Sequence, residues 1–516
     1  MEESTEPKDL LHDNAASPEA VNVSPATEEG ATEEHQHHHH PADAEHGSSL
    51  SGAIFNFTNS IVGAGAIGLG GAIAESGGII SVVTIIFFAV LAKLSLDMLI
   101  RLSVEVEGAH GSYEDLGQVG FGWVGRLTVL GSKFLYSFGC LVAYVIVVKD
   151  NFGPAAKSLI FGNVSESDSW LYKLLGEDVW TTWILGLVVI LPLCLLRDMT
   201  PLASLSVVSV VSMICIVGIV VYLYVANPNN EIRHASDGAY EDWFEVRPAF
   251  LECLGTFVFT FVSQHTVHLA FGSLKPRLRT VENWKMVSSY SILISGTVSL
   301  AVGVVVYMSF WEATESDIFE IYPAISSIDL AKLLLCVTML LTFPLPFFTC
   351  RELVIILVWP YAHTDEPVES TGVEDMQADL QEPLLEEHEN CPEEFDLFRS
   401  MSLTDLSVIT TQAVNVMNSF LLPGEERQLV LCLHVLITIK LWFVVTALAT
   451  VAPSLGDVLD LVGCATGTLI AFILPSLLAL KLQGYSHLAA FILIVGVIVG
   501  VVGTTFSLKK LASDTF

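Results

Sequence analysis

The chain contains a series of long apolar runs, and this feature limits its fold more than any other. A helix needs about 20 mostly apolar residues to cross the hydrocarbon core of a bilayer. The chain has 516 residues, of which 52% are hydrophobic and only 15% are charged. We predict an all-α integral membrane protein with spans at residues 51–74, 79–100, 130–148, 180–196, 202–225, 249–271, 288–310, 330–359, 429–450, 455–480 and 488–506.

Two polar segments between and before these runs hold most of the net charge. Residues 1–50 contain twelve acidic residues and one basic residue, and residues 361–427 contain sixteen and two, which together give −25 of the formal −33. Such composition is typical of solvated, disordered chain. The predicted organisation is an acidic tail, eight spans, an acidic loop, three spans and a short tail, at residues 1–50, 51–360, 361–427, 428–508 and 509–516.

Basic residues in the short connections predict the orientation. Lys275, Arg277, Arg279 and Lys285 follow the sixth run. Because Lys and Arg are enriched in cytosolic loops, this side is expected to be cytosolic, together with the N-terminus and both acidic segments. The connection between the third and fourth spans then lies on the opposite side, where Asn163 begins a glycosylation sequon.

The first span is unusually rich in glycine. Gly63, Gly65, Gly68, Gly70 and Gly71 crowd its middle, and each costs about 1 kcal/mol relative to alanine in a helix interior. Such a helix can open, and opened backbone in a membrane is tolerated where it lines a cavity, as in the discontinuous helices of secondary transporters. The alternative is a glycine surface for close helix packing.

A polar interruption in the sixth span favours the first interpretation. Ser263, Gln264, His265, Thr266 and His268 lie near its centre, where polar groups are costly. Two interrupted spans five apart are typical of an inverted repeat with its binding site at the midplane. For the histidine at 265, a hydrogen-bonded packing role, a substrate contact and a proton carrier all remain open.

The eighth span offers hydroxyl oxygens next to an expected helix opening. Thr338 and Thr342 lie one turn apart and precede Pro344. Their oxygens suit a monovalent cation, and hydrogen bonding to their own helix is the alternative. Elsewhere, Lys93 and Asp97 have the i, i+4 spacing of a structural ion pair.

Four separated motifs carry a resemblance to a known family. They are FNFTNSIVGAGAIGLGGA, GSYEDLGQVGFGWVGR, FVSQHTVHLAFGSLK and APSLGDVLDLVGCATGTLIAFILP, in that order. The chain resembles the amino acid/auxin permease superfamily, most closely its sodium-coupled neutral amino acid transporter branch, over about residues 50–360 and 428–506. The resemblance implies a LeuT-type inverted repeat of five plus five helices with one extra helix, eleven in all.

The resemblance also implies site residues. The substrate-binding candidates are Asn59, Gly63, Ala64, Gly65, Ser263, Gln264 and His265. The Na+ candidates are Asn59, Thr342 and, as second choice, Thr338. Many members of the family have His-His where this chain has Gln264-His265, which leaves the substrate and the coupling ion open.

These features predict a secondary active transporter for small neutral amino acids such as glutamine or alanine, coupled to Na+ or H+ by alternating access. We find no nucleotide-binding loop or catalytic constellation, so we expect no enzymatic activity, no cofactor beyond the coupling ion and no nucleic-acid partner. Membrane lipid is the expected surrounding, and a monomer the expected functional unit. The alternative is an amino acid sensor that signals through its acidic cytosolic segments.

A sorting signal is the remaining candidate motif. Glu6, Leu10 and Leu11 resemble an acidic dileucine signal that sorting adaptors bind. This motif favours a vacuolar or lysosomal membrane, and the plasma membrane is the alternative.

Overall fold

The computed structural model describes residues 47–106, 112–162, 169–195, 200–226, 243–323, 325–358, 431–452 and 454–515. Several predictions fall outside these ranges. They concern the acidic segments at 1–46 and 361–427, the sorting motif at Glu6, Leu10 and Leu11, and the sequon at Asn163.

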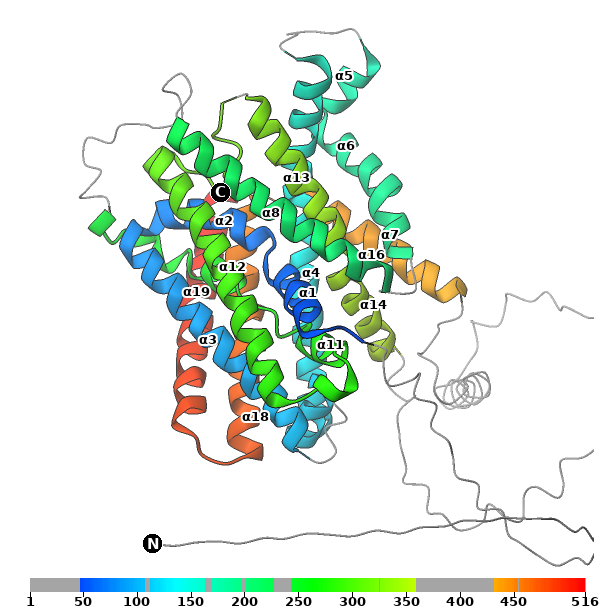
Figure 1. Ribbon diagram of the computed structural model, residues 1–516, viewed down its shortest axis with the longest axis vertical. Coiled ribbons are helices and arrows are strands. Elements are labelled where there is room, and N and C mark those ends of the chain that lie inside the picture. Colours follow the sequence, from blue (N-terminus) through cyan, green and yellow to red (C-terminus); the bar gives the residue numbers. More distant parts are fainter. Residues whose placement is uncertain are drawn as a thin grey trace, which may run out of the picture. The chain divides into compact units, whose positions relative to one another are not determined.

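The described residues form helices and one isolated β-bridge (Figure 1). The helices of the first half are α1 (Leu50–Ile61), α2 (Ala64–Ser76), α3 (Gly78–Glu105), α4 (Tyr113–Phe161), α5 (Trp170–Leu175), α6 (Asp178–Leu185), η2 (Gly186–Ile190), α7 (Leu191–Leu195) and α8 (Thr200–Ala226). Those of the second half are η4 (Pro248–Leu251), α10 (Leu254–Phe259), α11 (Val267–Gly272), η5 (Pro276–Leu278), α12 (Val281–Phe310), η6 (Trp311–Ala313), α13 (Ser326–Thr342), α14 (Pro344–Val358), α16 (Leu431–Val451), α17 (Leu455–Val462), η8 (Gly463–Gly467), η9 (Leu469–Ile473), α18 (Leu474–Leu482) and α19 (His487–Thr515).

Of the eleven spans expected from the sequence, all but the sixth have a matching apolar helix or bent helix pair in the described residues. Within the described ranges, nine helices are long and apolar enough to cross a membrane, and the bent pair α1 and α2 brings the number to ten. The expected sixth span at 249–271 folds as α10 and α11, each of six residues, with an open stretch between them. Neither of these helices is long enough to cross a membrane, because the centre of the expected span is not helical.

Two boundaries differ from those expected. Residues 509–515, expected as a tail, continue α19, and Lys510 forms an ion pair with Glu75 that supports this last turn. The motif GSYEDLGQVGFGWVGR, which lies between the second and third expected spans, enters α4 at Tyr113 and forms the first part of that helix. That helix is interrupted at Phe121 and Gly122, where Gly122 has a φ of 64°.

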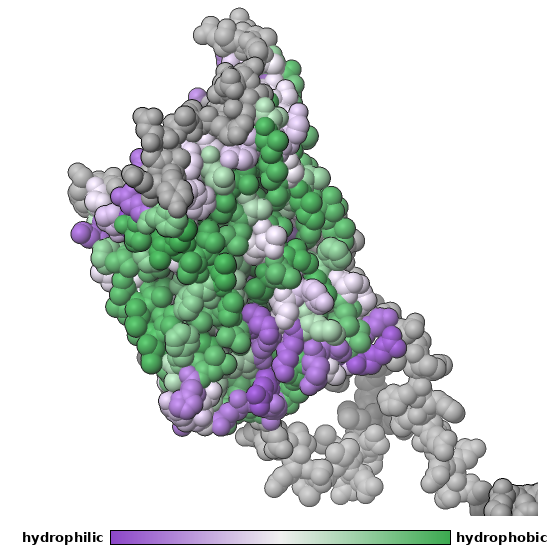
Figure 2. Space-filling view, turned by 60° about the vertical axis from the view of Figure 1, so that its left-hand side comes forward, coloured by the Kyte–Doolittle hydropathy of each residue, from purple (hydrophilic) through white to green (hydrophobic). Residues whose placement is uncertain are grey.

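Apolar side chains cover the outer faces of the long helices. Val83 and Val90 on α3, Leu293 on α12 and Ile498 on α19 are all exposed. Figure 2 shows a broad hydrophobic surface across the middle of the molecule, with hydrophilic residues gathered below it. Exposed apolar surface of this extent fits contact with lipid. The predicted pair of Lys93 and Asp97 is confirmed at 2.6 Å.

The centre of the bundle is formed by α2 and its neighbours. All residues from Ala64 to Ala74 are buried. The long helix α12 packs along α2, α3 and α1 (Figure 1). Helix α10 packs against α2 and α17. A helix that is buried on all sides needs small residues, and the glycines of this segment supply them. The glycine-rich sequence therefore allows close packing of α2, in addition to the predicted opening of the first span.

A short backbone pairing ties the start of α1 to the end of α11. Ser48 N–H donates to Ser273 O at 2.7 Å, and Lys275 N–H donates to Ser48 O at 3.2 Å. Gly47, with a φ of +135°, lies against the Lys275 backbone, where a Cβ would come within 2.8 Å of the Lys275 Cα. The pairing therefore requires glycine at this position.

Candidate functional site

The first span is broken where the sequence predicted an opening. Helix α1 ends at Ile61 and α2 begins at Ala64, with a bend of 49° between them. Val62 is extended, and Gly63 has a φ of −145° and a ψ of −148°. The first turn of a helix leaves N–H groups without intrahelical partners and carries the positive end of the helix dipole. Gly63, Ala64 and Gly65 thus present backbone donors suited to a carboxylate.

The sixth span is broken over a longer stretch. Residues 260–266 separate α10 from α11, and Ser263 and Gln264 are fully buried within this stretch. His265 is 8% exposed. The candidates of the sixth span therefore lie together in the open segment.

The two breaks lie against each other. A Cβ placed on Gly65 would sit 2.8 Å from the Thr260 Cα, closer than real Cβ atoms approach. A Cβ on Gly63 would lie 2.9 Å from the Tyr144 hydroxyl, which comes from α4. Glycine at Gly65 thus allows the broken backbones of the first and sixth spans to meet. The candidates that the sequence placed on separate spans are thereby brought into one region.

Tyr136 of α4 completes this region, and sequence reasoning missed it. Its hydroxyl lies 3.2 Å from Phe259 O and 3.1 Å from Val262 O, two carbonyls at the break of the sixth span. The ring centroid of Tyr136 is 5.0 Å from that of His265. Carbonyls freed by a helix break need donors in an apolar interior, and the tyrosine supplies one. A tyrosine inside the apolar run at 130–148 was the sequence signal that could have revealed it.

Several polar atoms at the breaks have no hydrogen-bond partner among the described residues. They are Thr58 Oγ1, Ser263 Oγ, Gln264 Nε2 and His265 Nδ1. Gln264 uses its Oε1 to accept from the Ser263 N–H at 3.0 Å. An unsatisfied buried polar group costs about 1–3 kcal/mol. Buried polar groups of this kind are suited to a small polar ligand.

The cation candidates are only partly gathered. Asn59 is buried on α1 and joins none of the side-chain hydrogen bonds found within the described ranges. Thr338 Oγ1 donates to Leu334 O at 2.9 Å, and Thr342 Oγ1 donates to Thr338 O at 2.8 Å. Both threonines thus bond to their own helix, and each hydroxyl oxygen keeps lone pairs. The principal contacts of α13 are with α4 and α8, whereas α1 packs against α12 and α8, and no described hydrogen bond joins Asn59 to either threonine.

The connection between α12 and α13 packs over α2. A Cβ on Gly71 would lie 2.8 Å from the Glu315 backbone, and a Cβ on Gly456 of α17 would lie 2.4 Å from the Ser316 Oγ. Asp317, 4% exposed, accepts hydrogen bonds from the Phe319 N–H at 3.0 Å and from Asn151 of α4. Burial raises the pKa of Asp317 to about 6. The loop is therefore held down through a buried carboxyl group.

We expect this carboxyl group to make stability fall as pH rises. An acid whose pKa is raised by folding stabilises the protein below its unfolded pKa, near 4, and this contribution is lost as pH rises through the folded value, about 6. Burial and the neighbouring Glu315 raise the pKa of Glu320 to about 7, which extends the same trend. The thermal midpoint of the purified protein should therefore decline between pH 4 and 8. For Asp317 alone, the free energy of unfolding should fall by about 3 kcal/mol over this range.

Asp317→Asn tests this expectation because it removes the titration and keeps the shape. The variant should show a clearly flatter dependence of the thermal midpoint on pH. An unchanged slope would contradict the assignment.

A bundle of apolar helices in which two broken helices meet around unsatisfied polar groups defines a polytopic membrane transporter. The chain matches the family of transmembrane amino acid transporter proteins over residues 46–511. It belongs to that family, the amino acid/auxin permease family, and the predicted membership is confirmed.

Curated relatives agree with this assignment. The chain is 29% identical over 315 residues to the rat (Rattus norvegicus) protein named "Putative sodium-coupled neutral amino acid transporter 11", covering 60% of this chain and 66% of the relative. The zebrafish (Danio rerio) protein of the same name is 27% identical over 471 residues, covering 90% of this chain and 87% of the relative. The chain thus spans slightly less than two thirds of the rat relative and most of the zebrafish one. The expectation of an amino acid transport protein is supported at this level.

Proposed function

We propose that the chain is a secondary active transporter that carries small neutral amino acids by alternating access, coupled to Na+ or H+. The observation that carries the proposal is the meeting of the two breaks, with Gly65 against Thr260. The N–H groups at the start of α2 are suited to the amino acid carboxylate, and Ser263 and Gln264 offer polar groups for the rest of the backbone. The names of the rat and zebrafish relatives support the same substrate class.

The chemistry of the site supports neutral over charged substrates. The candidate residues of the two breaks carry hydroxyl, amide and imidazole groups, and none of these seven residues is acidic or a lysine or arginine. A charged substrate side chain buried there would lack an opposite charge, which is costly in a low-dielectric interior. Glutamine and alanine are therefore the proposed substrates.

Uptake into proteoliposomes tests the proposal directly. Radiolabelled glutamine and alanine should accumulate under an imposed Na+ gradient or an imposed pH gradient, whereas arginine and glutamate should not. If Na+ is the coupling ion, Thr342→Ala should lower the accumulation by tenfold or more, because it removes a candidate cation ligand. Exposed Thr297, which bonds to its own helix α12 in the same way, provides the control variant Thr297→Ala. Preferred transport of arginine, or binding without accumulation under either gradient, would contradict the proposal.

A further inference from the structure

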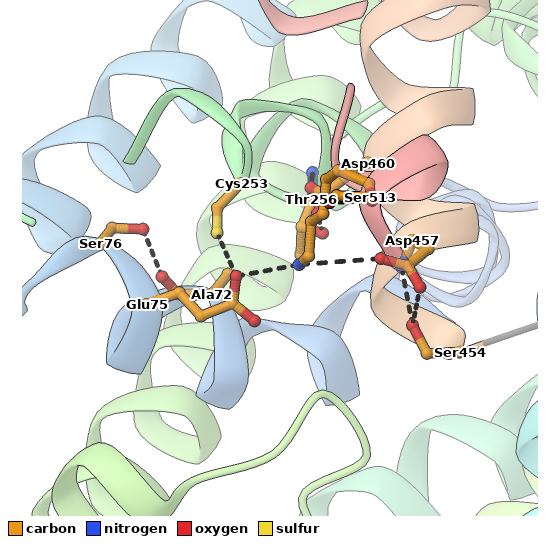
Figure 3. Close-up of polar contacts among 10 residues, drawn as sticks. Ala72, Glu75, Ser76, Cys253, Thr256, Ser454, Asp457, Asp460 and Ser513 are labelled. Carbon is orange, nitrogen blue, oxygen red and sulfur yellow. Dashed lines mark hydrogen bonds and ion pairs between the residues drawn. The ribbon is translucent and has the colours of Figure 1, made fainter. Parts of the chain in front are cut away.

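A charged cluster at one end of the bundle lies outside the region of the two breaks. It joins the end of α2, the start of α17, the residue before α10 and the last turns of α19 (Figure 3). Lys510 Nζ lies 3.0 Å from Glu75 Oε2 and 3.7 Å from Asp457 Oδ1. The Cys253 thiol lies 3.2 Å from the same Glu75 oxygen. Lys510 of α19 thus pairs with carboxylates of α2 and α17, and the Cys253 thiol contacts one of these carboxylates.

Asp460 belongs to this neighbourhood but is placed differently. It is 3% exposed, and its Oδ1 accepts from both the N–H and the Oγ1 of Thr256, each at 2.8 Å. Within the described part of the chain, its Oδ2 accepts no hydrogen bond, and no lysine or arginine nitrogen pairs with it. Lys510 already forms ion pairs with two other carboxylates, Glu75 and Asp457. A buried carboxylate without a counter-charge is costly, and taking up a proton removes that cost.

The position of Asp460 connects this carboxyl group to the candidate site. Its partner Thr256 lies in α10, the half-helix that leads into the break at 260–266. The backbones of α10 and the α17 region touch here, since a Cβ on Gly255 would lie 1.9 Å from Asp460 O, and one on Gly463 would lie 2.0 Å from Gly255 O. Any change in the bond between Asp460 and Thr256 therefore acts directly on the helix that forms the site.

We propose that Asp460 binds the coupling proton of this transporter, so that the coupling ion is H+. The inference rests on the proposed function and names its ion. In the ionised state, two hydrogen bonds to a carboxylate hold α10 against α17, and bonds to charged acceptors are about twice as strong as neutral ones. Uptake of one proton forms the neutral acid, weakens both bonds and lowers the negative charge of the cluster by one. Release of that proton on the other side restores the carboxylate.

The groups around Asp460 favour a proton over a metal cation. Those with charge or a titratable proton are Glu75, Cys253, Asp457, Cys464 and Lys510. A metal cation needs several oxygen ligands that are free to coordinate it. Here Oδ1 is occupied by two donors, which leaves a metal ion too few free oxygen ligands from this carboxylate. A proton needs one oxygen, and Oδ2 supplies it.

Asp460→Asn tests the inference because it keeps the shape and removes the titration. In proteoliposomes, accumulation of alanine driven by a pH gradient should fall at least tenfold, while exchange of external for internal labelled alanine, which needs no net proton movement, continues. Asp329→Asn is the matched control, because Asp329 is 5% exposed and accepts from the Ser158 hydroxyl at 2.6 Å. The control should keep the dependence on the pH gradient.

Thr256→Val provides a second measurement that does not change the carboxyl group. Loss of one donor to the ionised form disfavours that form, so the pH of half-maximal uptake should move upward by about half a unit or more. An unshifted pH profile would overturn the inference, and so would normal pH-driven accumulation in Asp460→Asn. Wild-type accumulation that follows Na+ and ignores pH would overturn it while leaving the proposed function intact. Absence of both exchange and accumulation in the wild type would instead reject the proposed function.

Discussion

Replacement of Gly65 by alanine is expected to abolish amino acid accumulation while the protein still inserts into the membrane. The added Cβ would lie 2.8 Å from the Thr260 Cα and 3.0 Å from its Oγ1. The nearest atom belongs to backbone, so the clash is not relieved by a rotamer change, and the two broken spans must separate. We expect a loss of at least tenfold in uptake of alanine, equivalent to about 1.4 kcal/mol or more.

Gly131→Ala is the matched control for this variant. Gly131 lies on α4, and a Cβ there would meet nothing within 4 Å. Alanine is also the better helix former by about 1 kcal/mol, so the control should be neutral or more stable. Equal uptake by the Gly65 variant and by the wild type, at equal amounts in the membrane, would show that the contact between the breaks is not needed for transport.

Tyr136→Phe is expected to weaken substrate binding by about tenfold. The hydroxyl is shared between Phe259 O and Val262 O. Phe259 O also accepts from the Val262 N–H at 3.3 Å, so removal of the hydroxyl leaves Val262 O as the carbonyl that loses its donor. An unsatisfied buried group costs about 1–3 kcal/mol, and 1.4 kcal/mol corresponds to a tenfold change in affinity. The ring itself remains to pack against His265, so the effect should lie in binding more than in folding. Equilibrium binding of labelled alanine to the purified protein measures it.

Tyr290→Phe makes the same chemical change where no effect is expected. Tyr290 lies on α12, and its side chain is 54% exposed. If both tyrosine variants bind alanine with wild-type affinity, the Tyr136 hydroxyl does not set the geometry of the break. If the Tyr136 variant loses thermal stability and keeps its affinity, its role is in folding alone.

The sequence was sufficient to predict where the spans lie and where the first of them opens. Apolar runs of about 20 residues and the low helix propensity of Gly63 and Gly65 are local properties, and the break between Ile61 and Ala64 follows from them. The sixth span was also located, because Ser263 and Gln264 interrupt an apolar run. Its division into two six-residue helices adds the detail that neither half could cross a membrane alone.

The contacts across the bundle could not be predicted in the same way. Tyr136 is 123 residues from Phe259, and Thr256 is 204 residues from Asp460, so no periodicity within one span joins either pair. Asp460 was nevertheless detectable in principle, because an acidic residue inside an apolar span is a functional candidate by default. The continuation of α19 through Lys510 was missed for a related reason, since the ion pair with Glu75 forms only in the folded bundle.

The pairing of Ser48 with Ser273 and Lys275 has a mechanical consequence. It fastens the leading end of α1 to the trailing end of α11, while the opposite ends of these two half-helices lie at the breaks. Because these backbone hydrogen bonds link the two half-helices at one end, α1 and α11 cannot tilt in opposite directions without breaking them. The two half-helices are therefore coupled at this end, and a tilt of α1 relative to the rest of the bundle is expected to carry α11 with it.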